Sequence, residues 1–292
     1  MSKLRLVAIA ILLALLYLKP VATLAERWWR DADYSHGFVV AAVSLFVALR
    51  ESRRARGRRT GSGGEGQSGT GWGQPLGAQG TRMGLALLIP GLVLYVLGTA
   101  GAEEFSTRVS LLPVLAGTMF LVGGKLAGSS LLFPIFFFGF AVPLPEVIYF
   151  SVTSPLQTLA ARLGTALAGS VGLVALREGN IVHVGGVSLG VAEACSGLRS
   201  LMAYFALSVL LAWYVQRGWL RKAILVLVTP VIAVSANALR LFVASVGAVA
   251  VGPGFLKGVQ HEISGVVTFF VGVGALLAFS ELLRWSARKT AA

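Results

Sequence analysis

Residues 223–248 read AILVLVTPVIAVSANALRLFVASVGA, and this stretch decides the fold class because Arg240 is its only charged side chain. An apolar run of about 18 residues or more is long enough for a helix to cross a bilayer. The whole chain shares this character, since 56% of its 292 residues are apolar and 13% are charged. Soluble domains have about 25% charged residues. The composition therefore predicts an all-α integral membrane protein and excludes a soluble enzyme or DNA-binding domain, despite a formal net charge of +13.

Other apolar runs, bounded by charged or turn-forming residues, predict about eight transmembrane helices in a single polytopic domain over residues 1–292. They lie at about 4–24, 36–49, 83–100, 109–123, 127–145, 198–216, 223–248 and 263–281. The first run is long and has no small-residue cleavage site, so we expect a retained span rather than a signal peptide. The stretch 151–176 is amphipathic and contains Gln157 and Arg162. We interpret it as interfacial or re-entrant helices rather than a ninth span.

The basic residues predict the orientation. With eight spans and the N-terminus inside, the inner segments hold sixteen basic and three acidic residues. The positive-inside rule then predicts a multi-pass protein of the plasma (inner) membrane with cytoplasmic N- and C-termini. Residues 51–82 begin ESRRARGRRT and continue with a Gly/Ser-rich run. We expect them to form a flexible basic cytoplasmic loop that contacts membrane lipid and no nucleic acid.

Residues 180–197 read NIVHVGGVSLGVAEACSG, and their apolar residues recur mainly at every second position. This alternation, with Gly185-Gly186 as the turn, predicts a short β-hairpin. Because lipid cannot satisfy a strand backbone, the hairpin must lie outside the hydrocarbon or be buried in protein, and we expect it on the extracytoplasmic side. The hairpin leads to Cys195, the single cysteine of the chain.

Three residues stand at the predicted outer ends of spans. Cys195 precedes the sixth span and is either a buried apolar cysteine or a nucleophile. Arg240 lies about 25 Å along the seventh span, where it either reaches the headgroups or donates to an oxyanion. His261 opens the eighth span as a capping residue or as an acid/base. If they converge, they supply nucleophile, oxyanion stabiliser and acid/base for acyl transfer.

The remaining polar residues give weaker signals. Arg199, Asn237 and His36 are candidate substrate-binding residues, with local packing as the alternative for His36. We expect Glu103, Glu104 and Arg108 to form a solvated outer loop and His183 to be structural. No cluster has metal-ligand spacing and no Gly-rich phosphate loop follows a strand, so we expect neither a metal nor a cofactor.

Several motifs together resemble the exosortase/archaeosortase family of membrane transpeptidases, from about residue 28 to 281. They are EACSG at 193–197, NALR at 237–240, His261, YSHG at 34–37 and FPIFFFGFAVPLP at 133–145. The resemblance implies Cys195, Arg240 and His261 as the catalytic set. It also implies secreted substrates with a C-terminal sorting signal, made of a short Pro-containing motif, a transmembrane helix and a basic cluster, as in PEP-CTERM proteins.

The sequence thus predicts a cysteine-dependent transpeptidase or endopeptidase that forms an acyl-enzyme thioester and transfers the substrate to an envelope acceptor or to water. Two alternatives stay open. A membrane transporter or channel would use Arg240 in its pathway, and solute flux would survive Cys195→Ala. A non-catalytic envelope assembly protein would tolerate conservative changes at Cys195, Arg240 and His261.

Overall fold

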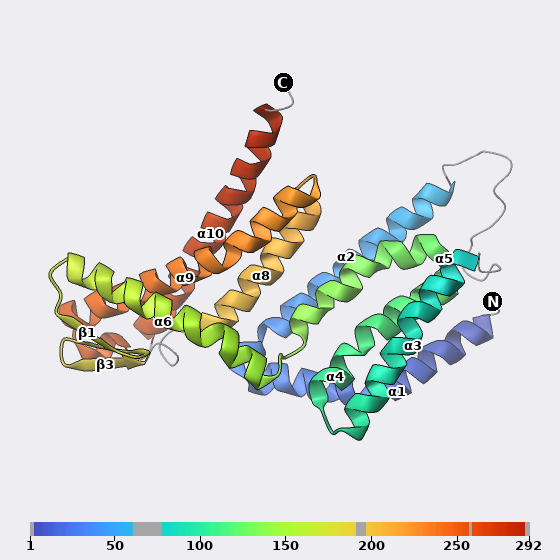
Figure 1. Cartoon of the computed structure of the whole chain (residues 1–292), viewed down its shortest axis with the longest axis horizontal. Coiled ribbons are helices and arrows are strands. Elements are labelled where there is room, and N and C mark those ends of the chain that lie inside the picture. Colours follow the sequence, from blue (N-terminus) through green and yellow to red (C-terminus); the bar gives the residue numbers. More distant parts are fainter. Residues whose placement is uncertain (1–2, 61–77, 191–196, 257–258, 290–292) are drawn as a thin grey trace. The chain divides into compact units, whose positions relative to one another are not determined.

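The computed structural model describes residues 3–60, 78–190, 197–256 and 259–289. It is mostly helical, with one small antiparallel sheet (Figure 1). The chain divides into two compact units, Met1–Leu144 and Pro145–Ala292. Each has fully buried side chains of its own, such as Phe120 in the first unit and Leu225 in the second.

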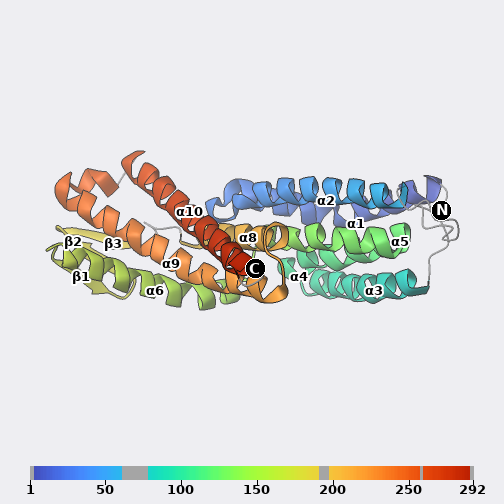
Figure 2. The same cartoon turned by 90° about the horizontal axis from the view of Figure 1, so that it is seen from above.

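The first unit is a helical bundle. Its elements are α1 (Lys3–Arg30), η1 (Ala32–Tyr34), α2 (His36–Thr60), α3 (Ala78–Ala100), α4 (Glu104–Val109), α5 (Leu111–Phe137) and η2 (Phe138–Ala141). Helix α5 lies between α2 and α3 (Figure 2). Small residues allow α3 and α5 to approach closely, since a Cβ atom at Gly117 would lie 2.6 Å from the Leu88 backbone nitrogen. Such close backbone contact is typical of helix pairs in membranes.

Helix α5 folds back on itself at Gly124, which has a φ of +70° inside the helix. A straight helix of this length would separate its ends by about 40 Å. Instead, a Cβ atom at Gly139, just after α5, would lie 3.2 Å from Leu112 near its start. The two arms of α5 therefore correspond to the predicted spans 109–123 and 127–145 (Figure 1).

Six helical segments of the described chain are long and apolar enough to cross a membrane, rather than the eight that were predicted. They are Leu4–Arg30, Ala32–Ala55, Ala78–Ala100, Glu104–Ala141, Trp219–Ala250 and Glu262–Ser286. The difference has two causes. The predicted spans 109–123 and 127–145 fall within one segment, and the predicted span 198–216 has a shorter described apolar part, Ser200–Tyr214. The molecule is a multi-pass membrane protein.

The expected loop 51–82 is shorter than predicted at both ends. Helix α2 continues to Thr60 and α3 begins at Ala78, while residues 61–77 lie outside the described residues. Arginine and alanine favour helix, and Arg54 forms an ion pair of 2.8 Å with Glu51, three residues earlier. The arginine-rich segment therefore extends the helix instead of opening the loop.

The second unit is built around its longest helix, α9. Its elements are α6 (Glu146–Ser170), β1 (Ala175–Glu178), β2 (Ile181–Val184), β3 (Val187–Gly190), α8 (Gly197–Tyr214), α9 (Trp219–Ala250), η3 (Pro253–Leu256) and α10 (Val259–Lys289). Helices α6, α8 and α10 all pack against α9. The sheet lies beside the C-terminal parts of α6 and α9 (Figures 1 and 2).

The predicted hairpin is confirmed and has one strand more than expected. Strands β2 and β3 pair antiparallel with Val184 opposite Val187, and β1 pairs antiparallel with β2. The turn between β1 and β2 uses Gly179, whose φ is +61°. Residues 151–170, interpreted as part of interfacial or re-entrant helices, form most of the single helix α6, and residues 175 and 176 begin β1. The amphipathic pattern continues past Ser170, so it did not indicate that α6 ends there.

Candidate functional site

The β-sheet, which precedes Cys195 in the sequence, packs against α6 and α9. Val182, Val184 and Leu189 on one face of the sheet are buried against Ala161 of α6 and Leu241 of α9. Leu241 follows Arg240 directly in the sequence, and β3 ends five residues before Cys195. The sheet, which ends five residues before Cys195, therefore packs against the part of α9 that carries Arg240.

Both turns of the sheet are held in place. At the first turn, Thr158 Oγ1 on α6 donates a hydrogen bond of 2.7 Å to Asn180 Oδ1. At the second turn, Gly185 adopts a φ of +57° and stands against Val249 of α9. A side chain at residue 185 would be strained by this φ and crowded by Val249. These contacts fix the sheet to the middle of α6 and to the C-terminal end of α9. Sequence patterns did not single out Thr158 or Asn180.

Tyr204 joins the three helices around the candidate site. It lies on α8, is almost fully buried and packs with Ala233 and Ala236 of α9. Its ring stacks on Phe269 of α10 at 5.1 Å between centroids, and its hydroxyl donates a hydrogen bond of 3.0 Å to the Phe269 carbonyl. Helices α8, α9 and α10 are therefore fixed against one another by a single side chain.

Arg240 lies near the C-terminal end of α9 with a partly buried side chain. Its guanidinium lies against Gly265 of α10, because a Cβ atom at Gly265 would be 2.8 Å from Nη2 and 2.9 Å from Cζ. Gly265 follows His261 by four residues, which places both on the same face of α10. Arg240 also interacts electrostatically with Tyr204. The structure thus brings the Arg240 guanidinium to within one helical turn of residue 261.

The structure describes the backbone position of two other predicted site residues but not that of Cys195. The predicted catalytic residue 261 lies in the first turn of α10, and the predicted substrate-binding residue 199 lies in the first turn of α8. Cys195 lies outside the described residues, two positions before α8 begins at Gly197. Its convergence with Arg240 and His261 stays a prediction.

Asn237 precedes Arg240 by one helical turn and lines a small cavity between α6, α8 and α9. The cavity is lined by Thr153, Leu156, Gln157, Leu201, Ala233, Val234 and Asn237. Its volume is about 20 Å³, which is enough for one water molecule. The lining of this cavity is mostly apolar, and Thr153, Gln157 and Asn237 are its polar residues.

His36 belongs to the first unit, where it joins two of the segments that carried the family resemblance. Its Nδ1 lies 3.0 Å from the Asp33 carbonyl oxygen and its Nε2 lies 3.2 Å from that of Phe140. Nearby, Trp28 Nε1 donates a hydrogen bond of 2.7 Å to the Ala141 carbonyl. The YSHG segment is therefore bound to the segment around residues 138–141 by backbone carbonyls, and a substrate contact for His36 stays a prediction.

The prediction that Arg108 belongs to a solvated outer loop is wrong, because its side chain is buried. Only 7% of it is exposed, and it forms an ion pair of 2.7 Å with Glu104. It also donates a hydrogen bond of 3.3 Å to Thr23 Oγ1 on α1. Arg108 thus links α4 to α1 inside the first unit, since a buried guanidinium needs such partners.

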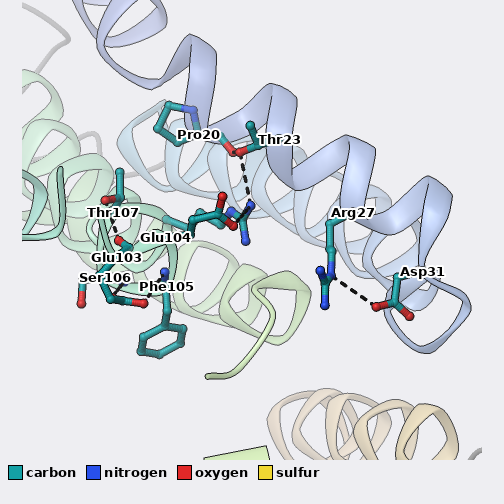
Figure 3. Close-up of polar contacts among 10 residues, drawn as sticks. Pro20, Thr23, Arg27, Asp31, Glu103, Glu104, Phe105, Ser106 and Thr107 are labelled. Atoms are coloured by element: carbon teal, nitrogen blue, oxygen red, sulfur yellow. Dashed lines mark hydrogen bonds and ion pairs between the residues drawn. The ribbon is translucent and has the colours of Figure 1, made fainter. Parts of the chain in front are cut away.

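Glu103 caps the N-terminus of α4 (Figure 3). Its carboxylate accepts hydrogen bonds from the backbone N–H groups of Phe105 at 2.8 Å and Ser106 at 2.6 Å. Hydrogen bonding from Ser106, with a smaller contribution from Phe105, holds the pKa of this carboxyl below its ordinary value of 4.5. On the neighbouring α1, Arg27 pairs with Asp31 at 3.3 Å (Figure 3).

Across the residues that the structure describes, no three His, Cys, Asp or Glu side chains come together as a metal-binding group.

The fold and the site define a multi-pass α-helical membrane protein in which Arg240 of α9 lies against Gly265 of α10 and the small sheet packs on the adjacent Leu241. The family model of the transmembrane exosortases (Exosortase_EpsH) matches residues 28–278. The chain therefore belongs to the exosortase family, and the resemblance seen in its motifs is confirmed. No curated protein and no solved structure matches it.

Proposed function

We propose that the chain is a cysteine transpeptidase of the inner membrane that cleaves the C-terminal sorting signal of secreted proteins on the extracytoplasmic side. The observation that carries the proposal is the Arg240 guanidinium against Gly265, one turn from His261. If the His261 imidazole reaches the same substrate group, the guanidinium can stabilise an oxyanion while the imidazole moves a proton. Membership of the exosortase family supports the substrate class.

The proposed reaction begins when the transmembrane helix of the substrate packs laterally against the enzyme and its motif reaches the site. The Cys195 thiolate attacks the scissile carbonyl carbon, so that a C–S bond forms and negative charge moves to the carbonyl oxygen. Arg240 donates hydrogen bonds to this oxyanion. His261, in its protonated form, gives a proton to the amide nitrogen as the C–N bond breaks. The products are a thioester on Cys195 and a released tail with a free amine.

The second half of the reaction resolves the thioester. His261, now neutral, takes a proton from the incoming nucleophile, which attacks the thioester carbonyl and expels the Cys195 thiolate. An amine or a lipid-linked acceptor gives transpeptidation, and water gives proteolysis. Because α8 begins two residues after Cys195, the positive end of its dipole favours the thiolate form of this cysteine. Arg199 and Asn237 are proposed as substrate contacts.

The test is to trap the acyl-enzyme. Membranes that contain the wild type, Cys195→Ala, His261→Ala or His183→Ala are incubated with a candidate tail-bearing secreted protein and analysed by mass spectrometry. We expect a thioester on the Cys195 peptide in the wild type and none in Cys195→Ala. His183→Ala is the matched control, because His183 lies on β2 beside Ser188 and Glu178 and is predicted to be structural.

His261→Ala should lower the rate of thioester formation by about 10²–10⁴-fold, the usual contribution of a general acid/base, whereas His183→Ala should process substrate at the wild-type rate. Normal processing by Cys195→Ala would contradict the proposal and favour a transporter or an assembly protein.

A further inference from the structure

Helix α10 carries three glycines whose surroundings differ. A Cβ atom at Gly265 would lie 2.8 Å from Nη2 and 2.9 Å from Cζ of Arg240. At Gly272 it would meet the ring and hydroxyl of Tyr204, and at Gly274 no atom lies within 4 Å. Of the three, Gly265 is the glycine whose missing side chain makes room for a candidate catalytic group.

The two crowded glycines differ in which neighbour would have to move. Ordinary contacts of a Cβ atom lie at 3.4–4 Å, so an alanine at residue 265 would push the guanidinium back by about an ångström. The guanidinium is the far end of a flexible side chain, and its displacement costs little folding free energy. At Gly272 the neighbour is the buried Tyr204 ring, which also stacks on Phe269 and cannot retreat.

We propose that Gly265 is a positioning residue whose missing side chain forms the slot for the Arg240 guanidinium, one helical turn from residue 261. The slot would fix where the guanidinium can donate to the oxyanion. A displacement of 1 Å at a catalytic group can lower a rate by roughly 10²-fold. This inference rests on the proposed transpeptidase function, because the slot matters to the rate only if Arg240 acts on the reacting group.

The test compares Gly265→Ala, Gly272→Ala and Gly274→Ala in the full chain in membranes. For each variant we would measure the rate of thioester formation per folded molecule, the abundance in the membrane and the melting temperature in detergent. Gly265→Ala should lower the rate by about tenfold or more and leave abundance and melting temperature close to the wild type. Gly272→Ala should lower the melting temperature and leave the rate per folded molecule unchanged. Gly274→Ala should change neither.

A double-mutant cycle with Arg240→Lys connects the effect to the guanidinium. Lysine presents a compact ammonium rather than a planar fork, so Gly265→Ala should lose most of its effect in the Arg240→Lys background. Gly272→Ala should keep its effect on the melting temperature in that background. Multiplicative effects of Gly265→Ala and Arg240→Lys, or a full rate in Gly265→Ala, would overturn the inference about the slot.

The two proposals fail in different ways. A full rate in Gly265→Ala with no thioester in Cys195→Ala overturns the slot and leaves the transpeptidase proposal intact. Normal processing by Cys195→Ala overturns the transpeptidase proposal itself, and the slot with it.

Discussion

Each unit of the protein holds an arginine away from full solvent exposure, and the two differ in what surrounds the guanidinium. Arg108 in the first unit is 7% exposed and is held by Glu104 and Thr23. Arg240 in the second unit is partly buried and lies in a space left by Gly265, one turn from His261. The first arginine joins α4 to α1, whereas the second lies against a glycine of the neighbouring helix α10.

This difference shows how a charged group in a membrane protein can be assigned a role. A buried guanidinium with a carboxylate partner from its own helix is part of the packing, because breaking the pair would leave a desolvated charge. The Arg240 guanidinium instead lies against a glycine of a neighbouring helix, one turn from residue 261. In the first unit, both ring nitrogens of His36 face backbone carbonyls.

The largest expected effect is on the rate of thioester formation, which should distinguish Arg240 from Arg108. Arg240→Lys should lower the rate of thioester formation by roughly 10²-fold, because an oxyanion donor contributes about 10²–10³ and lysine does not reproduce the planar fork. Arg108→Lys should leave the rate per folded molecule unchanged. The measurement is acyl-enzyme trapping with a candidate substrate, normalised to folded protein. Equal losses of rate in both variants would remove the distinction between the two sites.

The next effect separates the two arginines by stability. Glu104→Gln should lower the free energy of unfolding by about 1–3 kcal/mol, because it leaves the buried Arg108 guanidinium without its carboxylate. The matched change Glu262→Gln, on α10 beside His261, removes a carboxylate that is exposed and should cost less than about 1 kcal/mol. Thermal unfolding in detergent compares the two. A larger loss in Glu262→Gln would contradict the structural role assigned to Arg108.

A smaller effect tests the attachment of the sheet to the second unit. Thr158→Val removes the hydroxyl that donates to Asn180 at 2.7 Å and should lower stability by about 1 kcal/mol. It should also slow thioester formation severalfold, because the sheet holds the segment that leads to Cys195. Thr165→Val is the control, since its hydroxyl donates only within α6, to Ala161. Identical rates for both variants would show that the first turn of the sheet does not position the site.

Sequence patterns predicted most of the helices and the hairpin, because apolar runs and alternation report burial directly. They also separated the two arms of α5, since the predicted spans 109–123 and 127–145 meet beside Gly124, where the helix reverses. They missed β1, because its residues continue an amphipathic pattern and the turn at Gly179 becomes visible only when β1 pairs with β2.

The sequence likewise indicated some residues of the candidate site and not others. Arg240 and His261 were singled out by residue type and place in a span, and the family resemblance strengthened both predictions. Gly265 and Tyr204 were not singled out, because their contacts join helices that are distant in sequence. The prediction of a solvated outer loop was wrong for Arg108 but not for the exposed Glu103 and Glu104, because the burial of Arg108 involves Thr23, 85 residues away on α1.

The smallest expected effect concerns the cap of α4, a charged group that is solvated, in contrast to Arg108. The pKa of Glu103 is lowered in the folded state by hydrogen bonding from Ser106 and Phe105. Its contribution to stability is therefore fully present above an unfolded pKa of about 4.5 and is lost as the pH falls through the folded pKa. Because the carboxyl is largely exposed, solvent screening keeps the contribution below about 1 kcal/mol.

Replacing Glu103 with Gln should remove this part of the pH dependence and leave thioester formation unchanged. The measurement is the melting temperature of wild type and Glu103→Gln, recorded as the pH is lowered from 6 to 3. The difference between them should be largest at pH 6 and shrink toward pH 3, because the wild-type carboxylate becomes protonated. A difference that grows toward low pH would show that the cap is stronger in its neutral form, and the sign of the pKa shift would then be wrong.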